Sequence, residues 1–462
     1  MARVATSGSS RVSIQRAPHV NGPVMNPVVP ASHQQEWVSA RSGEDAWPHL
    51  LRIFPADLNV STLSQALDLL VERHEALRTT FRRSGGQLLQ EVRAPFCVPL
   101  TVDDNSGALT GDELAMGSSL HDDVVRAVRR VFDLAEGPVL AARLWRLDSG
   151  EYLVLIVVHH IAVDTWSMAV ILSDLAELYR CAVEGTKPDL AEQRMRYRDF
   201  AVWQRFGAGS RLHTKHVEFW RQQLADRPPP VGLPNPKTMD PSAEHQPTVI
   251  PILFDEAAVA DIGALARTAR LPRSAVLLTA FQIVLGRCTG RHHALVGFPT
   301  TNRPLSDLDP VVGVFTTMLP LQVRFAEHEP FGEVLRRSGG TLMDAYAHQD
   351  LFIGEVLRKL DHPVRLYDLF RFVFGYDDHT VGPLRSQTFG RPVSFTIASN
   401  ARYELSVVLQ RTEGGISGSA AFPAERVDRH VVEELIDEFV RFTAAAAKQP
   451  DIPMSAHARR QR

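Results

Sequence analysis

The chain has 462 residues, which is long for one compact core and favours two domains. Lysine and arginine number 50 against 53 aspartates and glutamates, and the net charge of −3 gives no basic excess for nucleic acid. The sequence contains no stretch of about 18 apolar residues, and a membrane span is therefore not predicted. Residues 1–24 lack the apolar region of a secretory signal and are expected to form a flexible tail. Three scattered cysteines do not form a disulfide framework and favour a reducing, cytoplasmic setting.

Helices and strands are predicted to alternate along the chain. Apolar residues at three-and-four spacing predict a helix over Leu58–Phe81. A run of aliphatic and β-branched residues predicts a buried strand over Tyr152–Val158, and a helix follows Trp166. Farther on, the expected helices are Ala257–Ala269, Ser274–Arg287 and Val431–Ala446, and the expected strands are Thr248–Phe254, His293–Phe298, Phe370–Tyr376, Glu404–Thr412 and Ser417–Phe422.

Proline marks the boundary between two halves of the chain. Seven prolines lie in residues 226–247, where they remove backbone donors and exclude regular structure. We therefore expect an N-terminal domain over 25–225, a linker over 226–247, a C-terminal domain over 248–448 and a tail over 449–462. Strands mixed with helices in both halves predict two α/β domains side by side.

A histidine pair and an aspartate follow the predicted strand in the segment His159-His160-Ile161-Ala162-Val163-Asp164. A neutral imidazole accepts and returns a proton near pH 7, and a nearby carboxylate fixes a tautomer or pairs with an arginine. A histidine pair packed at the end of a core strand would give the same pattern. A metal site is not favoured, because the spacing differs from the zincin helix and no further ligand follows at a suitable spacing.

Seven ordered motifs support a functional interpretation of the histidine pair. They are Ser32-x-x-Gln35, Arg73–Phe81, Phe132–Pro138, His159–Ser167, Tyr197–Gln204, Gly297–Arg303 and Gly313–Leu321. From about Pro30 to Ala446, the chain resembles the condensation-domain superfamily of nonribosomal peptide synthetases. The ordered set of motifs is specific to this superfamily, whereas no single motif is specific by itself.

The resemblance implies an α/β fold of two chloramphenicol-acetyltransferase-like domains in a V-shaped pseudo-dimer. A tunnel between them would receive phosphopantetheine arms, the donor arm on a peptidyl carrier protein. The acceptor would be a small molecule or a second carrier protein, and no cofactor would be bound. With no adenylation or carrier motif visible in the sequence, we expect a free-standing enzyme that forms amides or esters. No covalent enzyme intermediate is needed, and no nucleophile elbow is evident.

The same resemblance assigns roles to the motif residues. His160 would be the central catalytic residue, as a general base or by positioning the nucleophile, and His159 is grouped with it. Asp164 would be mainly structural, with Arg303 as its partner.

Three motif residues outside the histidine segment are expected to support the fold. Arg73 and Arg78 resemble the family's motif arginines, although a solvated helix end would also explain them. Trp203 is interpreted as a core or inter-domain packing residue rather than a substrate platform.

Departures from the family pattern concern the channel and the oxyanion contact, for which Thr165, Ser167 and Gly375 are candidates. Thr165 stands where the family usually has glycine, and it keeps a backbone N–H for an oxyanion. Gly375 stands where an asparagine is usual, and Asp350–Ile353 lacks the usual proline. These changes favour an unusual acceptor, such as a small freely diffusing amine or alcohol.

Three alternatives stay open. A related epimerase shares the histidine motif but also carries a Glu-Gly-His-Gly-Arg motif, which we do not find. A non-catalytic recruitment platform shares the fold but loses the second histidine, whereas His160 is present. An acyltransferase that uses coenzyme A in place of a carrier protein is poorly distinguished by sequence.

Overall fold

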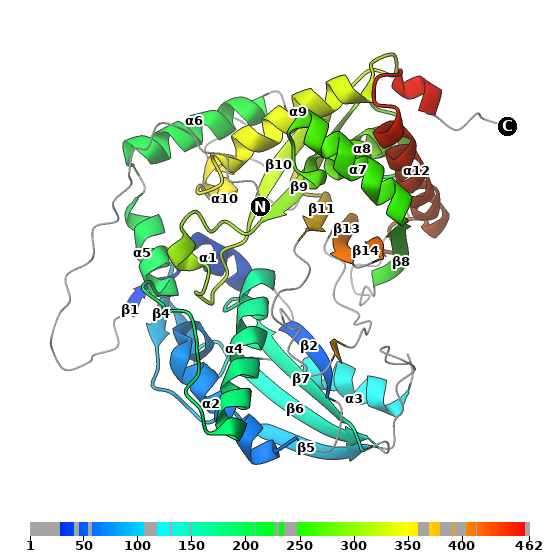
Figure 1. Cartoon of the computed structure of the whole chain (residues 1–462). Helices are drawn as coiled ribbons and strands as arrows, with labels where there is room; N and C mark the ends of the chain where they lie inside the picture. Colours follow the sequence, from blue (N-terminus) through cyan, green and yellow to red (C-terminus); the bar gives the residue numbers. More distant parts are fainter. Residues whose placement is uncertain are drawn as a thin grey trace.

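Figure 1 shows the computed structural model, in which two α/β lobes lie one above the other. The structure describes residues 28–40, 46–53, 58–105, 118–129, 132–147, 150–207, 209–225, 227, 231–234, 247–358, 369–378, 391–392, 403–412 and 414–457. The expected tail over 1–24 and most of the expected linker lie outside these residues.

The N-terminal lobe is built on a five-stranded sheet and a smaller three-stranded sheet. The larger sheet has the order β12 (Arg391–Pro392), β2 (Ala46–Ile53), β7 (Tyr152–His159), β6 (Leu140–Leu147) and β5 (Leu100–Asn105). The smaller sheet has the order β1 (Val28–Pro30), β4 (Gln87–Val92) and β3 (Thr79–Ser84). The helices are α1 (His33–Ser39), α2 (Val60–Arg73), α3 (Ser119–Val128), α4 (Thr165–Glu184) and α5 (Tyr197–Phe206), with a 3-10 turn at Glu75–Arg78.

The C-terminal lobe is built on a six-stranded sheet. Its order is β10 (Thr317–Arg324), β9 (His293–Thr300), β11 (Phe372–Asp377), β13 (Leu405–Thr412), β14 (Gly415–Pro423) and β8 (Pro247–Phe254). The helices α7 (Glu256–Ala269), α8 (Arg273–Cys288), α9 (Phe331–Tyr346) and α12 (Arg429–Lys448) cover one face (Figure 1). Helix α6 (Arg211–Ala225) contacts α10 (Ile353–Leu357) beside this lobe.

Two segments of the C-terminal half cross into the N-terminal lobe. Strand β12 pairs with β2 and extends the N-terminal sheet. The loop between β9 and β10, residues 301–316, is called the crossing loop. It places Leu308, Val312 and Phe315 in the hydrophobic core of the N-terminal lobe. The lobes therefore share structure across the expected domain boundary.

Two predictions about element ends are wrong. The expected helix Leu58–Phe81 ends at Arg73, because His74 has an extended backbone (φ −102°, ψ 98°). The β-branched Thr79 and Thr80 then begin strand β3, where such residues are favoured. The expected C-terminal tail is also folded as far as residue 457, since Met454 is fully buried and its N–H donates to the Glu329 carbonyl.

His216 on α6 is a buried ring whose titration is expected to make the fold sensitive to acid. The side chain packs edge-on against His348, and neither ring nitrogen has a hydrogen-bond partner among the described residues. Burial, followed by the charges of His348, Lys215 and His213, lowers the pKa of His216 from 6.5 to about 4. Between these values the unfolded chain binds more protons than the folded chain, and acid therefore favours unfolding.

Replacing His216 with phenylalanine is expected to reduce this acid sensitivity. Because its pKa is lowered, His216 is expected to reduce the free energy of unfolding by roughly 2 kcal/mol between pH 7 and pH 5. The phenylalanine variant has no titrating ring at this position and should not show this loss. Chemical denaturation at pH 7 and pH 5 measures the effect. His430→Phe, at a strongly exposed ring on α12, is the control. Equal pH dependence in wild type and His216→Phe would contradict the assignment.

Candidate active site

The candidate site lies where strand β7 ends and helix α4 begins. His159 is the last residue of the strand, residues 160–163 turn, and the helix starts at Thr165. Asp164 caps the helix, because its Oδ1 accepts a hydrogen bond from the Ser167 N–H at 2.8 Å. The motif thus occupies a strand–turn–helix junction that fixes its backbone.

The His160 ring is held in one tautomer by its own loop. Its Nδ1 lies 2.8 Å from the carbonyl oxygen of Val163. Because a carbonyl oxygen can only accept, Nδ1 carries the proton, and Nε2 is the basic atom of the neutral ring. The side chain is half-buried. This arrangement gives His160 a nitrogen that can take up a proton from a nucleophile.

The ring of His159 makes different contacts from the ring of His160. Its buried Nδ1 accepts a hydrogen bond from the Ile161 N–H at 3.0 Å, and its ring meets the edge of Phe132. These contacts hold the turn that carries His160. The geometry therefore favours a positioning role for His159 over the catalytic role with which the sequence grouped it.

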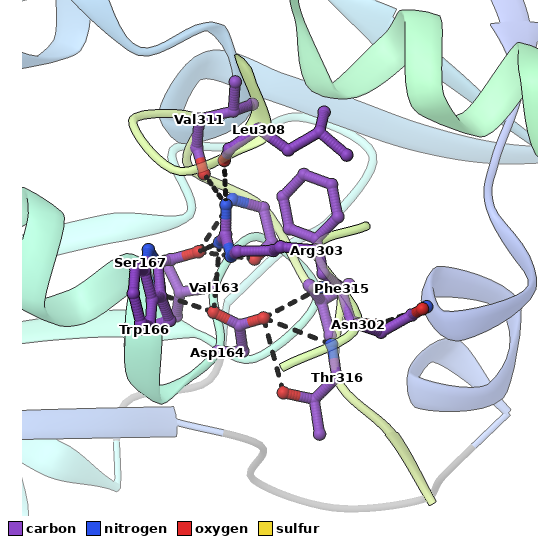
Figure 2. A network of polar contacts seen from close by, with 12 residues as sticks. Val163, Asp164, Trp166, Ser167, Asn302, Arg303, Leu308, Val311, Phe315 and Thr316 are labelled. Atoms are coloured by element: carbon purple, nitrogen blue, oxygen red, sulfur yellow. Dashed lines mark hydrogen bonds and ion pairs between the residues drawn. The ribbon is translucent and has the colours of Figure 1, made fainter. Parts of the chain in front are cut away.

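Asp164 is buried at the centre of a polar network (Figure 2). Its Oδ2 accepts hydrogen bonds from the N–H of Phe315 at 2.9 Å and of Thr316 at 3.2 Å, and from the Thr316 hydroxyl at 3.3 Å. Its Oδ1 lies 3.5 Å from Nη2 of Arg303. The pairing of Asp164 with Arg303, expected from the family resemblance, is confirmed.

Arg303 is almost as deeply buried as its partner. Its guanidinium donates to the carbonyls of Leu308 and Val311 and lies 4.0 Å from the ring centroid of Phe315. Burial lowers the pKa of Arg303, and the opposing charge of Asp164 offsets part of that effect. The ion pair therefore ties the crossing loop of the C-terminal half to the start of α4 (Figure 2).

Ser167 is not the channel or oxyanion group that the sequence suggested. Its hydroxyl donates to the Gly313 carbonyl at 2.6 Å and accepts from the Gly313 N–H at 3.0 Å and from Arg303 at 2.8 Å. A hydroxyl has one proton, which is used here, and the residue is fully buried. Ser167 instead fastens the crossing loop to α4.

Gly313 is required by the close approach of Tyr197. A Cβ at Gly313 would lie 1.8 Å from Cδ2 of Tyr197, which leaves no room for a side chain. The Tyr197 hydroxyl donates to the Val314 carbonyl at 2.8 Å and accepts from Ser32 at 2.7 Å. Burial raises the pKa of Tyr197 far above its usual value, which keeps the hydroxyl protonated as a donor.

Arg73 and Arg78 lie in the body of the N-terminal lobe. Arg73 ties α2 to α4 through Asp174 at 2.7 Å, and Nε2 of the buried His74 lies 3.0 Å from the same carboxylate. Burial lowers the pKa of His74. Burial alone would raise the pKa of Asp174, but its contacts with His74 and Arg73 have the larger effect, and the pKa of Asp174 is lowered. Arg78 donates to the carbonyl of Arg93. Both positions agree with support of the fold.

Thr165, Gly375 and Trp203 occupy three different environments. Thr165 is exposed at the first turn of α4, where backbone N–H groups lack intrahelical acceptors. Gly375 is buried in β11, and a Cβ there would make ordinary contact with Pro299 at 3.5 Å. Trp203 packs against Phe200, with ring centroids 6.0 Å apart. This contact agrees with the packing interpretation of Trp203, and the roles of Trp203, Thr165 and Gly375 stay predictions.

Several residues of the network were not predicted. Phe315 and Thr316 bind Asp164 through backbone N–H groups, which no side-chain pattern reveals. Trp166 belonged to the matched motif, but its contact with the Asp309 carbonyl at 2.9 Å was not foreseen. In the ranges that the structure describes, no three His, Cys, Asp or Glu side chains are grouped to hold a metal ion.

Comparison with known families agrees with this geometry. The Condensation domain family model matches residues 29–458, and the chain therefore belongs to the condensation-domain family. A linear gramicidin synthase of Brevibacillus parabrevis is 27% identical over 87% of this chain. A probable non-canonical nonribosomal peptide synthetase, CymA, of Salinispora arenicola is 31% identical over 85%. The match covers 8% and 5% of these two longer proteins.

Solved structures share the fold over nearly the whole chain. The X-domain from teicoplanin biosynthesis has a TM-score of 0.80 at 22% identity, covering 95% of this chain and 99% of its own. SgcC5 from Streptomyces globisporus has a TM-score of 0.72 at 21% identity, covering 92% and 100%. The predicted fold, two chloramphenicol-acetyltransferase-like domains in a pseudo-dimer, is confirmed. No helix among the described residues is long and apolar enough to cross a bilayer.

Proposed function

We propose that the chain transfers an acyl or aminoacyl group from a carrier-protein phosphopantetheine thioester to an amine or alcohol, forming an amide or ester in natural-product biosynthesis. The observation that carries this proposal is the tautomer of His160, whose Nδ1–H is bound by the Val163 carbonyl. The basic Nε2 is thereby set in a loop that Asp164 and Arg303 hold rigid. Membership of the condensation-domain family supports the same chemistry.

In the proposed reaction the acceptor nitrogen or oxygen attacks the thioester carbonyl carbon. His160 Nε2 takes up the acceptor's proton, or aligns the acceptor by a hydrogen bond, as the carbon–nucleophile bond forms. The negative charge develops on the carbonyl oxygen, and the Thr165 N–H is the backbone donor we assign to it. Collapse of the intermediate breaks the carbon–sulfur bond, and the phosphopantetheine thiol leaves with the proton.

A donor and acceptor competition tests this proposal. The same acyl group is offered on a carrier protein and on coenzyme A, with a free amine, a matched alcohol and a carrier-bound aminoacyl group as acceptors. We expect transfer from the carrier protein and a higher kcat/KM for one of the small acceptors. A strong preference for the carrier-bound acceptor would reject the small-acceptor hypothesis, and transfer from coenzyme A alone would reject the carrier-protein donor.

Recruitment of a partner enzyme is the second candidate function. The observation in its favour is the TM-score of 0.80 to the X-domain, which has also been solved in complex with OxyB. The basic Nε2 of His160 has no role in such a platform. Turnover that depends on His160 therefore distinguishes the enzyme from the platform.

A further inference from the structure

Three successive carbonyl groups of the crossing loop, at residues 309–311, each accept a hydrogen bond from a different side chain. In the order of the carbonyls, the donors are Trp166 at 2.9 Å, Gln193 at 3.1 Å and Arg303 at 2.8 Å. Trp166 lies in the first turn of α4 and Arg303 pairs with Asp164, and these two donors therefore belong to the candidate active site. The middle carbonyl is bound by Gln193, which belongs to none of the ordered motifs.

Gln193 lies in the connection between α4 and α5, which is fastened to the body of the N-terminal lobe. The Asp189 N–H donates to the Glu177 carboxylate of α4 at 3.0 Å. The Ala191 carbonyl accepts from Arg73 of α2 at 2.6 Å. Gln193 therefore reaches the crossing loop from a segment that two helices hold in place.

The side-chain amide of Gln193 has three partners, and they agree on its orientation. Its Nε2 lies 3.0 Å from Nδ1 of His74 and 3.1 Å from the Pro310 carbonyl oxygen. Its Oε1 accepts from Nη1 of Arg196 at 2.6 Å. Because a carbonyl oxygen can only accept and an arginine can only donate, the amide nitrogen faces Pro310 and the amide oxygen faces Arg196.

The third partner, His74, presents an acceptor to the same amide nitrogen. Nε2 of His74 lies 3.0 Å from Oδ2 of Asp174, which also pairs with Arg73 at 2.7 Å. A carboxylate oxygen accepts, and Nε2 of His74 therefore carries the ring proton. Burial lowers the pKa of His74, which keeps the ring neutral near pH 7 and leaves Nδ1 as an acceptor. The Gln193 nitrogen thus donates one hydrogen to His74 and the other to Pro310.

The Pro310 carbonyl is the only backbone group through which this residue can be hydrogen-bonded, because proline has no N–H. Planar peptide units join it to its neighbours, and a shift of this carbonyl therefore displaces the Val311 carbonyl as well. The Val311 carbonyl binds Arg303, which pairs with Asp164 (Figure 2). Asp164 ends the turn that carries His160, and the hydrogen bonds therefore connect Pro310 to the catalytic loop.

We propose that Gln193 is a positioning residue, which holds the crossing loop against the start of α4 and so keeps His160 aligned for acyl transfer. It acts through Pro310 and Arg303 rather than on the reacting atoms. The essential property of Gln193 is its pair of N–H donors, and the oxygen that binds Arg196 is secondary. This inference rests on the proposed function, because it names a further residue for that reaction.

Two substitutions of similar length separate the donors of Gln193 from its acceptor. Gln193→Glu keeps an oxygen for Arg196 but sets a second acceptor against the Pro310 carbonyl and Nδ1 of His74. Gln193→Lys keeps donors for both groups and gives up the acceptor. We expect Gln193→Glu to lower kcat about tenfold with KM for the carrier-bound donor within about twofold of wild type, because misalignment affects the chemical step. Gln193→Lys should keep kcat within about threefold of wild type.

A spectroscopic measurement follows the crossing loop without turnover. In protein labelled with 5-fluorotryptophan, Trp166→Phe identifies the fluorine signal of Trp166, whose Nε1 is bound by the Asp309 carbonyl next to Pro310. Gln193→Glu should shift this signal, and Gln193→Lys should leave it in place. The signal of Trp220, buried in the core of the C-terminal lobe, should stay unchanged in both variants and shows that they are folded.

Gln87→Glu is the matched control, because Gln87 is exposed on β4 and the same change of charge is made there. It should leave kcat and the Trp166 signal as in wild type. A wild-type kcat or an unmoved Trp166 signal in Gln193→Glu would overturn the inference, as would an equal loss of kcat in Gln193→Lys. Absence of transfer in the wild type, with a Trp166 signal that moves only in Gln193→Glu, would reject the proposed function and leave the anchoring of the loop by Gln193 standing.

Discussion

Replacing His160 with alanine is expected to lower turnover by about 10²–10⁴-fold, the usual contribution of a positioned acid–base group. The physical reason is the loss of Nε2, the basic atom of a ring whose Nδ1–H is bound by Val163. Single-turnover assays of acyl transfer measure the effect. Because His160 is half-buried and its ring contacts its own loop, thermal unfolding of the variant should stay close to wild type.

A histidine far from the site provides the control for this variant. His430 is strongly exposed on α12, and His430→Ala should turn over like wild type. Turnover of purified His160→Ala within a factor of about three of wild type would contradict the catalytic assignment, because the contribution expected of such a group would be missing. Absence of turnover in the wild type as well as in His160→Ala would instead favour the recruitment platform.

Replacing Asp164 with alanine is expected to destabilise the fold by roughly 3–5 kcal/mol, as when one partner of a buried ion pair is removed. Arg303 would stay buried without its counter-charge, and the N–H groups of Phe315 and Thr316 would lose their acceptor. Chemical denaturation gives the unfolding free energy. Activity should fall mainly in proportion to the folded fraction, since the contacts of Asp164 with Arg303, Phe315 and Thr316 join the two halves of the fold.

A surface carboxylate provides the comparison for Asp164. Glu192 pairs with Arg194 at 2.9 Å where both side chains are largely exposed, and Glu192→Ala should cost less than about 1 kcal/mol. Asp164→Asn is a second test, because it keeps an acceptor while it removes the charge. An unfolding free energy of Asp164→Ala equal to that of wild type would show that the pair contributes nothing to stability.

A long apolar run made one buried strand easy to predict. Tyr152–Val158 was placed within one residue of β7, because this strand is buried on both faces. Strand β6 was missed, since Arg143 and Arg146 interrupt its apolar residues. Helix α2 was extended too far, because apolar spacing continues past His74 although the backbone turns there.

The motif residues of the candidate site could be predicted from the sequence, but their backbone contacts could not. The tautomer of His160 depends on a backbone carbonyl, and the binding of Asp164 depends on two backbone N–H groups. Backbone groups are the same at every residue, and their pairing is therefore set by the fold rather than by a motif. The partnership of Asp164 with Arg303 came from family resemblance, because spacing alone gives no reason to bring them together.

The crossing loop also sets the order in which the protein can be completed during synthesis. Phe315, which donates to Asp164 and fills part of the N-terminal core, lies 151 residues farther along the chain. At about 5–20 residues per second, the ribosome needs roughly 8–30 s to cover that distance. In that interval the nascent N-terminal half holds Asp164 without Arg303, Phe315 and Thr316, and it leaves uncovered the apolar surface that Phe315 later fills. A chain halted before the loop is thus expected to bind chaperones, unlike a protein whose first domain closes before the second is made.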